Sequence, residues 1–566
     1  MWPFSSSSWK AVAQQKVDER AKALQTALPT SPEQSVFLVA SASEIVKRIE
    51  AGEWTASEVL EAYISRAALA QQTTNCLTEV LFDEARVHAQ ALDEHMRCTK
   101  KLKGPLHGVP VSFKDIFDIS GYDSSMGHTS EAHKPAQEDA ELVRLVREAG
   151  GIPFVKTNVP QTLMFFECVN PTWGRTLNPY SADHTSGGSS GGEGALLAMD
   201  GSALGWGSDI GGSLRIPASF CGIYSLKPGH GRLSTGGAKE NMPGFDAVKT
   251  VVGPMGRSVA DIELACRVGF GQESENYDPA PIPYRNVKLR EKLKFGYYVN
   301  DGFIRSSPAS RRAVLETVEA LRREGHECVE FAIPDMLKAI NIFLSLTLAD
   351  GNKTLFSPIR QDPRQPELTT MAIGPEMYDW TRSLITWALR NVMGDAAIAD
   401  IMSACKPTTV NEFWSVIDQQ KAFIRKINKE VWEKYEFDGI IAPVLPIPPL
   451  PHQSVMYIAS IACASFFYNV ADSPVGTVPV TRVNPELDGL TDEWRNQPIV
   501  SSPMLEGLLY KGDKAIYNVE KMSGLPVGVQ VVGRKWGEEK VVEMMKVVDG
   551  ALGKRGFGPG CWEAKA

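Results

Sequence analysis

The stretch from residue 185 to residue 217 constrains this chain more than any other part of it. It reads T-S-G-G-S-S-G-G-E-G, continues through small and apolar residues, and ends in G-W-G-S-D-I-G-G-S-L-R-I-P. Two of its serines, Ser189 and Ser213, are bordered by glycines. Glycine lets the backbone adopt positive φ and lets a substrate come close to backbone N–H groups. The pattern favours two tight turns, each presenting a serine beside backbone donors.

A lysine, Lys114, precedes both serines in the segment G-V-P-V-S-F-K-D, and no His-and-Asp pairing accompanies either serine. A lysine can activate a serine only when its amine is neutral, and burial lowers a lysine pKa. Val109, Val111 and Phe113 alternate as in a strand, which places Lys114 at a strand end beside the core. Asp115 would keep the amine charged if it lay close. We expect Asp115 to point away, because adjacent strand residues face opposite sides.

Each segment has a more ordinary interpretation when taken alone. G-G-S-S-G-G is typical of a flexible linker or a turn, and a single lysine is typical of a solvated surface. A phosphate-binding loop is excluded because neither G-K-[ST] nor G-x-G-x-x-G after a strand is present. The three segments together, in this order, favour a serine hydrolase in which a lysine moves the proton.

Three further segments extend this pattern: T-N-V-P-Q at 157–161, C-G-I-Y-S-L-K-P-G-H-G-R at 221–232, and G-L-P-V-G-V-Q-V-V-G at 524–533. With them, the chain resembles the amidase signature family over roughly residues 38–553. Within that family it is most similar to the fungal acetamidase group, which is related to the fatty acid amide hydrolases. The resemblance implies one large amidase signature domain at 37–566, preceded by an N-terminal helical extension at 1–36.

The resemblance also implies a role for each matching residue. Ser213 matches the nucleophile, Ser189 the serine that relays its proton, and Lys114 the general base and later acid. In the family the peptide bond entering the relay serine is cis, which here is Gly188–Ser189. The remaining implied positions are the oxyanion and substrate contacts Ile210, Gly211, Gly212 and Leu163, and the supporting residues Ser190, Asp209 and Arg215.

Composition agrees with an ordinary globular enzyme. Apolar residues make up 43% and charged residues 22% of the 566 residues, and the net charge of −8 argues against a general nucleic-acid role. The nine cysteines include no C-x-x-C pair, and the histidines show no ligand spacing, so no metal and no cofactor are expected. No stretch reaches 18 apolar residues and no secretory signal is visible, so we expect a cytoplasmic protein without a membrane span.

Helix and strand patterns alternate along the chain, which predicts an α/β fold with a large central mixed β-sheet flanked by helices. The expected helices are 11–28 (solvated), 55–69 with a capping box, 137–149, 310–323, 411–435 and 538–552. The expected strands are 152–155, 293–299, 326–331, 438–443, 475–483 and 525–532. Residues 441–453 contain five prolines and are expected to form a loop outside the core. Residues 484–523 are expected to form a long polar loop, either covering the substrate entrance or decorating the surface.

The predicted function is hydrolysis of a carboxylic acid amide to an acid plus ammonia or an amine. One alternative is the amidase subunit of a glutamine-dependent amidotransferase, and another is a catalytically silent binding protein on the same scaffold. The predicted partner is a small-molecule amide, and the resemblance implies a possible homodimer. Acetamide, aryl amides, indole-3-acetamide and longer acyl amides all remain candidate substrates. Met164, Phe165 and Phe166, next to Leu163, suggest an apolar acyl pocket.

Overall fold

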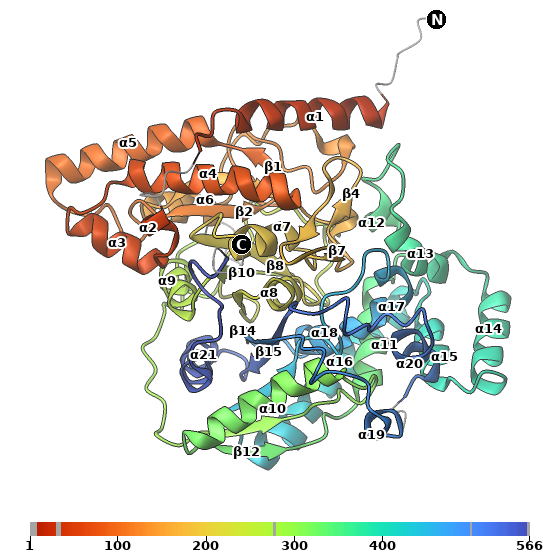
Figure 1. The fold of residues 1–566 in the computed structure, drawn as a ribbon. Coiled ribbons are helices and arrows are strands. Elements are labelled where there is room, and N and C mark those ends of the chain that lie inside the picture. The colour runs from red at the N-terminus through yellow and green to blue at the C-terminus, as the bar shows by residue number, and fades with distance from the viewer. Residues whose placement is uncertain (1–7, 30–34, 275–278, 498–500, 563–566) are drawn as a thin grey trace, which may run out of the picture.

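The computed structural model describes residues 8–29, 35–274, 279–497 and 501–562. Its centre is a sheet of eleven strands in the order β1-β3-β2-β8-β10-β9-β14-β15-β13-β11-β12. Figure 1 shows the N-terminal helices gathered over one end of this sheet and the helix α10 at the other end. The α/β prediction of a large mixed sheet flanked by helices is therefore confirmed.

The strands of this sheet are β1 Leu77–Val80, β2 Pro110–Lys114, β3 Ile152–Thr157, β8 Leu204–Asp209, β9 Tyr224–Lys227, β10 Val251–Gly256, β11 Lys294–Tyr297, β12 Glu327–Glu330, β13 Gly439–Pro443, β14 Val475–Arg482 and β15 Pro526–Val532. The main helices are α1 Trp9–Leu24, α3 Ala42–Glu50, α4 Ala56–Thr74, α5 Phe82–Thr99, α6 Glu141–Glu148, α7 Gly191–Ala198, α8 Arg215–Cys221, α9 Val259–Gly269, α10 Pro308–Arg323, α11 Met336–Thr347, α13 Thr369–Glu376, α14 Asp379–Asn391, α15 Ala396–Ala404, α16 Val410–Ile427, α18 Cys463–Val470, α20 Pro503–Tyr510 and α21 Glu538–Leu552.

The sheet has a group of three parallel strands towards each end and antiparallel pairs between these groups, and its edge strand β1 pairs with β3 antiparallel. β2 runs parallel to both β3 and β8, and β11 runs parallel to both β12 and β13. The pairs between β8 and β13 are antiparallel. The first parallel group matters for function, because Lys114 stands at the end of β2 beside the end of β8.

Local sequence signals explain several helix boundaries. Thr55 and Glu58 form the predicted capping box at the start of α4. The helix runs five residues past its predicted end, because Asn75 takes up the left-handed conformation that ends it. The helix predicted at 137–149 begins only at Glu141, and the one predicted at 411–435 continues from α16 into a π-helical turn, Asn428–Glu433.

The prediction for residues 441–453 is wrong in one respect. The segment after β13 is irregular, as the prolines require, but Val444 and Leu450 are fully buried. Proline prevents a ladder of hydrogen bonds, yet other segments satisfy the carbonyls here. Pro446 O accepts from Ser307 N (2.7 Å) and Leu450 O accepts from Thr185 N (2.9 Å). Burial of this segment is therefore decided by tertiary packing, not by its composition.

Helix α1 is also less solvated than its mixed charges predict. Lys16 and Arg20 lie on a buried face, and Lys16 Nζ pairs with Glu79 (2.7 Å) and Asp123 (2.9 Å). The charged side of α1 therefore packs against the rest of the protein and forms ion pairs with it.

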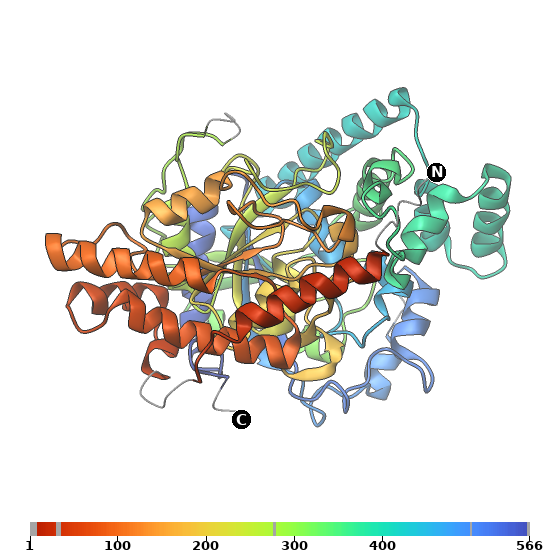
Figure 2. The ribbon, with the colours of Figure 1, turned by 90° about the horizontal axis from the view of Figure 1, so that it is seen from above.

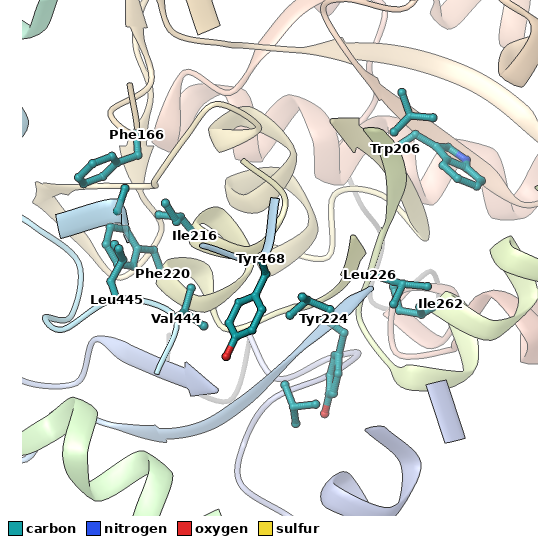
Figure 3. Packing of buried hydrophobic residues seen from close by; sticks show 14 of the residues in the cluster. Phe166, Trp206, Ile216, Phe220, Tyr224, Leu226, Ile262, Val444, Leu445 and Tyr468 are labelled. Carbon is teal, nitrogen blue, oxygen red and sulfur yellow. The ribbon is translucent and has the colours of Figure 1, made fainter. Parts of the chain in front are cut away.

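Buried side chains run continuously through the sheet and its helices. In Figure 3, Phe166, Ile216 and Leu445 lie on one side of this core and Trp206 and Ile262 on the other. Helix α14 lies at the outer edge of the molecule, as Figure 1 and the view from above in Figure 2 show, and α15 packs against both α14 and α11. Within the described ranges, none of the helices combines the length and the apolar character needed to cross a membrane.

Candidate active site

Lys114 is completely buried at the end of β2. Its amine lies 2.6 Å from Ser189 Oγ and 2.8 Å from Ser208 Oγ. Both partners are neutral hydroxyls, and among the described residues no carboxylate forms an ion pair with this amine. Burial lowers the pKa of Lys114 to about 7, although the more distant Asp209, Cys168 and Glu193 oppose this shift. Near neutral pH a substantial share of the amine therefore carries a lone pair.

Asp115 points away from Lys114, as expected from strand alternation. Its Oδ1 pairs with Lys156 Nζ at 3.1 Å, and its Oδ2 accepts from Ser125 Oγ at 2.7 Å. The carboxylate next in sequence to Lys114 is thus occupied elsewhere. Because the Asp115 carboxylate does not contact the Lys114 amine, burial has the dominant effect on the Lys114 pKa.

The two glycine-bordered serines come together because their turns are hydrogen-bonded to one another. Ser190 N donates to Ser213 O (3.2 Å), and Ser190 Oγ donates to Ser208 O (3.4 Å). The Gly188–Ser189 peptide bond is cis, as the family resemblance implied. A Cβ at Gly207 would lie 2.7 Å from Ser190 Oγ, so the strand can approach the serine turn only with glycine at this position.

Asp209 organises the turn that carries Ser213. Its carboxylate accepts from the N–H groups of Gly212 (2.8 Å) and Leu214 (3.0 Å) and from the guanidinium of Arg215 (2.9 and 3.0 Å). Burial alone would raise the pKa of Asp209, but Arg215 and the hydrogen bonds hold it below its ordinary value. Asp209 is therefore ionised and keeps the turn in one conformation.

This geometry corrects one of the predicted oxyanion contacts. The N–H of Gly212 is already engaged by Asp209, and Gly212 does not line the cavity described below. With φ of +127°, it provides the bend of the turn. Ile210 and Gly211 do line the cavity, and the N–H groups of Gly211 and Ser213 have no acceptor within the described part of the chain.

An apolar cavity of about 310 Å³ opens beside Ser213. The predicted residues Leu163, Met164, Phe165 and Phe166 all contribute to its wall. The rest of the lining comes from distant segments, including Phe343 of α11, Ile401 of α15, Phe466 of α18 and Leu505 of α20. The sequence signals could not assign these residues, because each belongs to an apolar stretch that is indistinguishable from ordinary core.

Segment 484–523, which was expected to be a long loop, reaches the cavity through a helix. It contains α20, whose Met504 and Leu505 belong to the cavity wall. Leu163 in the cavity wall and its neighbour Thr162 have positive φ (62° and 67°). A non-glycine residue held in this region is strained, and such strain is commonly found at functional sites.

Sequence reasoning missed several polar residues of the site. Ser208 is the second partner of the Lys114 amine, and its position directly before Asp209 at the end of a strand was the available signal. Asn469 and Gln530 hold the Arg215 guanidinium at 2.6 and 2.8 Å and lie far away in sequence. No group of three or more His, Cys, Asp or Glu side chains suited to a metal occurs among the residues described.

Comparison with known proteins assigns the family. Residues 58–542 match the family model described as Amidase. The chain is 35% identical over 527 residues to the putative amidase kk1C of Curvularia clavata, covering 91% of this chain and 88% of that one. It is 34% identical over 534 residues to an acetamidase of Emericella nidulans (91% and 89% covered) and 32% identical over 518 residues to fatty-acid amide hydrolase 1 of Sus scrofa (89% and 84% covered).

Among solved structures, a fatty acid amide hydrolase superposes with a TM-score of 0.84 at 26% sequence identity, covering 98% of both chains. The family match spans the segments that carry Lys114, Ser189 and Ser213. The chain therefore belongs to the amidase signature family and is an amide hydrolase.

Proposed function

We propose that this protein hydrolyses carboxylic acid amides through an acyl-enzyme on Ser213, with Ser189 as proton relay and Lys114 as base. The observation that carries the proposal is the 2.6 Å contact between the buried Lys114 amine and Ser189 Oγ, in a site without a carboxylate partner for the amine. Amide nitrogen is a poor leaving group, so the same catalyst must first remove and later return a proton.

The first half-reaction moves one proton along the triad. The Lys114 amine takes the proton of Ser189 Oγ while Ser189 Oγ takes that of Ser213 Oγ, and Ser213 Oγ bonds to the carbonyl carbon. Negative charge then develops on the carbonyl oxygen, which the N–H groups of Gly211 and Ser213 stabilise, assisted by that of Ile210. Lys114 returns its proton through Ser189 to the departing nitrogen, the C–N bond breaks, and an ester on Ser213 remains.

The second half-reaction repeats this sequence with water. Lys114 and Ser189 accept a water proton as the water oxygen attacks the ester carbon. Cleavage of the ester bond releases the carboxylic acid, and the proton returns to Ser213 Oγ. Ammonia or an amine leaves in the first half and the acid in the second.

The cavity indicates which acyl groups fit. Its wall is built mainly of aliphatic and aromatic side chains, so we propose an apolar acyl group longer than acetyl. Each additional buried methylene contributes about 0.8 kcal/mol, or roughly a fourfold gain in kcat/KM until the cavity is filled. A series of primary amides of increasing acyl length tests this, and a flat or falling kcat/KM from acetamide upward contradicts it.

Covalent labelling tests the nucleophile. A serine-directed fluorophosphonate is expected to add one label per chain on Ser213, and the Ser213→Ala variant is expected to take up none. Ser219→Ala is the matched control, because Ser219 lies on the neighbouring helix and hydrogen-bonds to Gly528 N (3.1 Å), outside the cavity. Unchanged labelling of Ser213→Ala would show that another residue is the nucleophile.

Product analysis with the purified chain separates the alternatives. Release of ammonia from a primary amide by this chain alone supports hydrolysis. Activity that requires a second protein supports the amidotransferase subunit, and binding without turnover supports the silent scaffold.

A further inference from the structure

Glu193 is a buried carboxyl group to which the triad mechanism gives no task. It lies in the first turn of α7 and is completely buried. Its Oε2 lies 2.7 Å from Ser112 Oγ on β2, and its Oε1 lies 2.8 Å from Thr157 Oγ1 on β3. Ser112 is two residues before Lys114 on the same strand. Glu193 thus connects the helix that follows the Ser189 turn to the strand that carries the base.

The surroundings of Glu193 differ from those of the other buried carboxylates. Asp209, Asp115 and Glu506 each pair with a lysine or arginine at 2.7–3.1 Å. Asp301, which has no such partner, accepts two backbone N–H bonds of 2.8 Å. Across the described residues, Glu193 has neither a cation within ion-pair distance nor a backbone N–H. An ionised carboxylate without these partners is strongly unfavourable in the interior.

The hydroxyl partners accommodate the protonated acid. A proton on Oε2 can be donated to Ser112 Oγ, whose own hydrogen then points to Leu204 O at 3.4 Å. Oε1 remains free to accept from Thr157 Oγ1. The protonated group therefore leaves no polar atom of this cluster unsatisfied.

The charges that face this cluster favour an ionised Glu193, but their effect is smaller than that of burial. Among the described residues, Lys114 on β2 is the cation whose field reaches it, and the Cys76 thiol interacts with it from the segment before β1. The α7 dipole favours a negative charge here, but Ser190 N, which an N-terminal glutamate often binds, is used by Ser213 O. Burial raises the pKa of Glu193 to about 8, against the opposing hydrogen bonds and Lys114.

The neighbouring groups do not titrate in the working range. Burial raises the pKa values of the Cys76 and Cys168 thiols to about 12, and Asp209 stays ionised. Only Lys114 and Glu193 are therefore left to change charge between about pH 6 and pH 9 in this cluster.

We propose that Glu193 is a neutral carboxylic acid in the active protein, a positioning residue that fastens α7 to β2 and β3 without placing a negative charge beside the Lys114 amine. The positioning role rests on the proposed function of Lys114 as base, whereas the protonation of Glu193 does not. An ionised Glu193 would favour the charged form of Lys114 and raise its pKa. The base would then be lost at neutral pH.

Infrared difference spectroscopy tests the protonation directly, without any substrate. The wild type minus Glu193→Gln spectrum at pH 6.5 is expected to contain the C=O stretch of a protonated carboxyl group, and this band is expected to vanish well above pH 8. In Ser112→Ala the band is expected to shift but persist, because one hydrogen-bond partner is lost. A wild type minus Gln spectrum without this band overturns the proposal.

The pH dependence of kcat/KM tests the positioning role. Glutamine is a neutral group of the same shape, so the acid limb of Glu193→Gln is expected to stay within about 0.5 pH unit of the wild type. Glu193→Leu loses both hydrogen bonds, and its kcat is expected to fall roughly tenfold to a hundredfold below that of the Gln variant, again without moving the limb. A shift of the Gln limb to lower pH by a full unit shows that Glu193 is ionised.

Equal kcat for the Leu and Gln variants shows that the two hydrogen bonds position nothing. The two proposals fail separately. A wild type that shows the carboxyl band but hydrolyses no amide refutes the proposed catalytic function and leaves the protonation of Glu193 established.

Discussion

Two buried lysines on neighbouring strands show how the same burial leads to opposite chemistry. Lys114 on β2 and Lys156 on β3 both have no solvent-exposed surface. Lys156 stands opposite Phe113 in the register, so the two amines point to opposite faces of the sheet. Lys156 Nζ meets the Asp115 carboxylate at 3.1 Å and Ser124 Oγ at 2.7 Å, whereas Lys114 Nζ meets two serine hydroxyls and, in the described part of the chain, no carboxylate.

The comparison teaches that the partner, and not the depth of burial, decides what a buried lysine does. A carboxylate offsets part of the free-energy cost of burying an ammonium group, so the ion pair at Lys156 is structural. Two hydroxyls offset much less of that cost, so burial lowers the pKa of Lys114 to about 7 and leaves neutral amine for the base role that we propose. Asp115 follows Lys114 in the sequence, yet it serves the other lysine.

The largest expected effect is on activity. Lys114→Ala is expected to lower kcat/KM by about 10³- to 10⁴-fold, because both the base and the later acid are lost. Lys114→Arg is expected to fail equally, since a guanidinium stays charged. Steady-state kinetics on one good amide measures this. A Lys114→Ala variant that retained a tenth of the wild-type rate would place the base elsewhere.

The next effect is on stability and belongs to the other lysine. Lys156→Met leaves the Asp115 carboxylate buried without its cation and is expected to lower the free energy of unfolding by about 3–5 kcal/mol. Lys114→Met is the matched control and is expected to cost clearly less, because only hydrogen bonds to hydroxyls are lost. Denaturant unfolding of both variants measures the difference. Equal losses contradict the distinction between the two lysines.

Placing a carboxylate beside Lys114 would remove the difference between the two lysines. The wild-type acid limb is expected near pH 7, with activity rising above it as the Lys114 amine loses its proton. Ser208→Asp places a carboxyl group where Ser208 Oγ now lies 2.8 Å from that amine, and the limb is expected to move up by about 1–3 pH units. Ser208→Asn is the uncharged control of similar size. A limb that stays in place in the Asp variant argues against Lys114 as the titrating group.

The smallest expected effect tests a hydroxyl partner on the structural side. Ser124→Ala removes one hydrogen bond from Lys156 and is expected to cost about 1 kcal/mol of stability. The acid limb is expected to stay unchanged, because Lys156 and its carboxylate remain paired. Thermal unfolding together with a pH profile checks both statements, and a shifted limb would connect Lys156 to the reaction.

Much of the site could be read from local patterns. The glycines around Ser189 and Ser213, and the alternation of Val109, Val111 and Phe113 before Lys114, report backbone conformations that only a few residue types allow. The direction of Asp115 followed from the same alternation. The large mixed sheet was likewise predictable, because helix and strand periodicity extends over many residues.

Other features depend on which distant segments meet. The buried course of Val444 to Leu450 was mistaken for an outer loop, since prolines exclude regular structure but not burial. The N–H of Gly212 was assigned to the substrate, although the Asp209 side chain captures it. Several acceptors can compete for one N–H group, and the order of residues along the chain does not show which of them will bind it.

The sequence by itself thus determined the α/β class, through its periodicity, and the amide-hydrolase family, through its motifs. It also predicted Lys114, Ser189 and Ser213 as the triad that we propose. The tertiary structure alone decided that Lys114 meets two hydroxyls while Asp115 meets Lys156, and that segments far apart in the sequence enclose the apolar cavity beside Ser213. The physical reason is that pKa values and cavity shape depend on desolvation and on neighbours across the fold, and neither quantity exists before the sheet and its helices have packed.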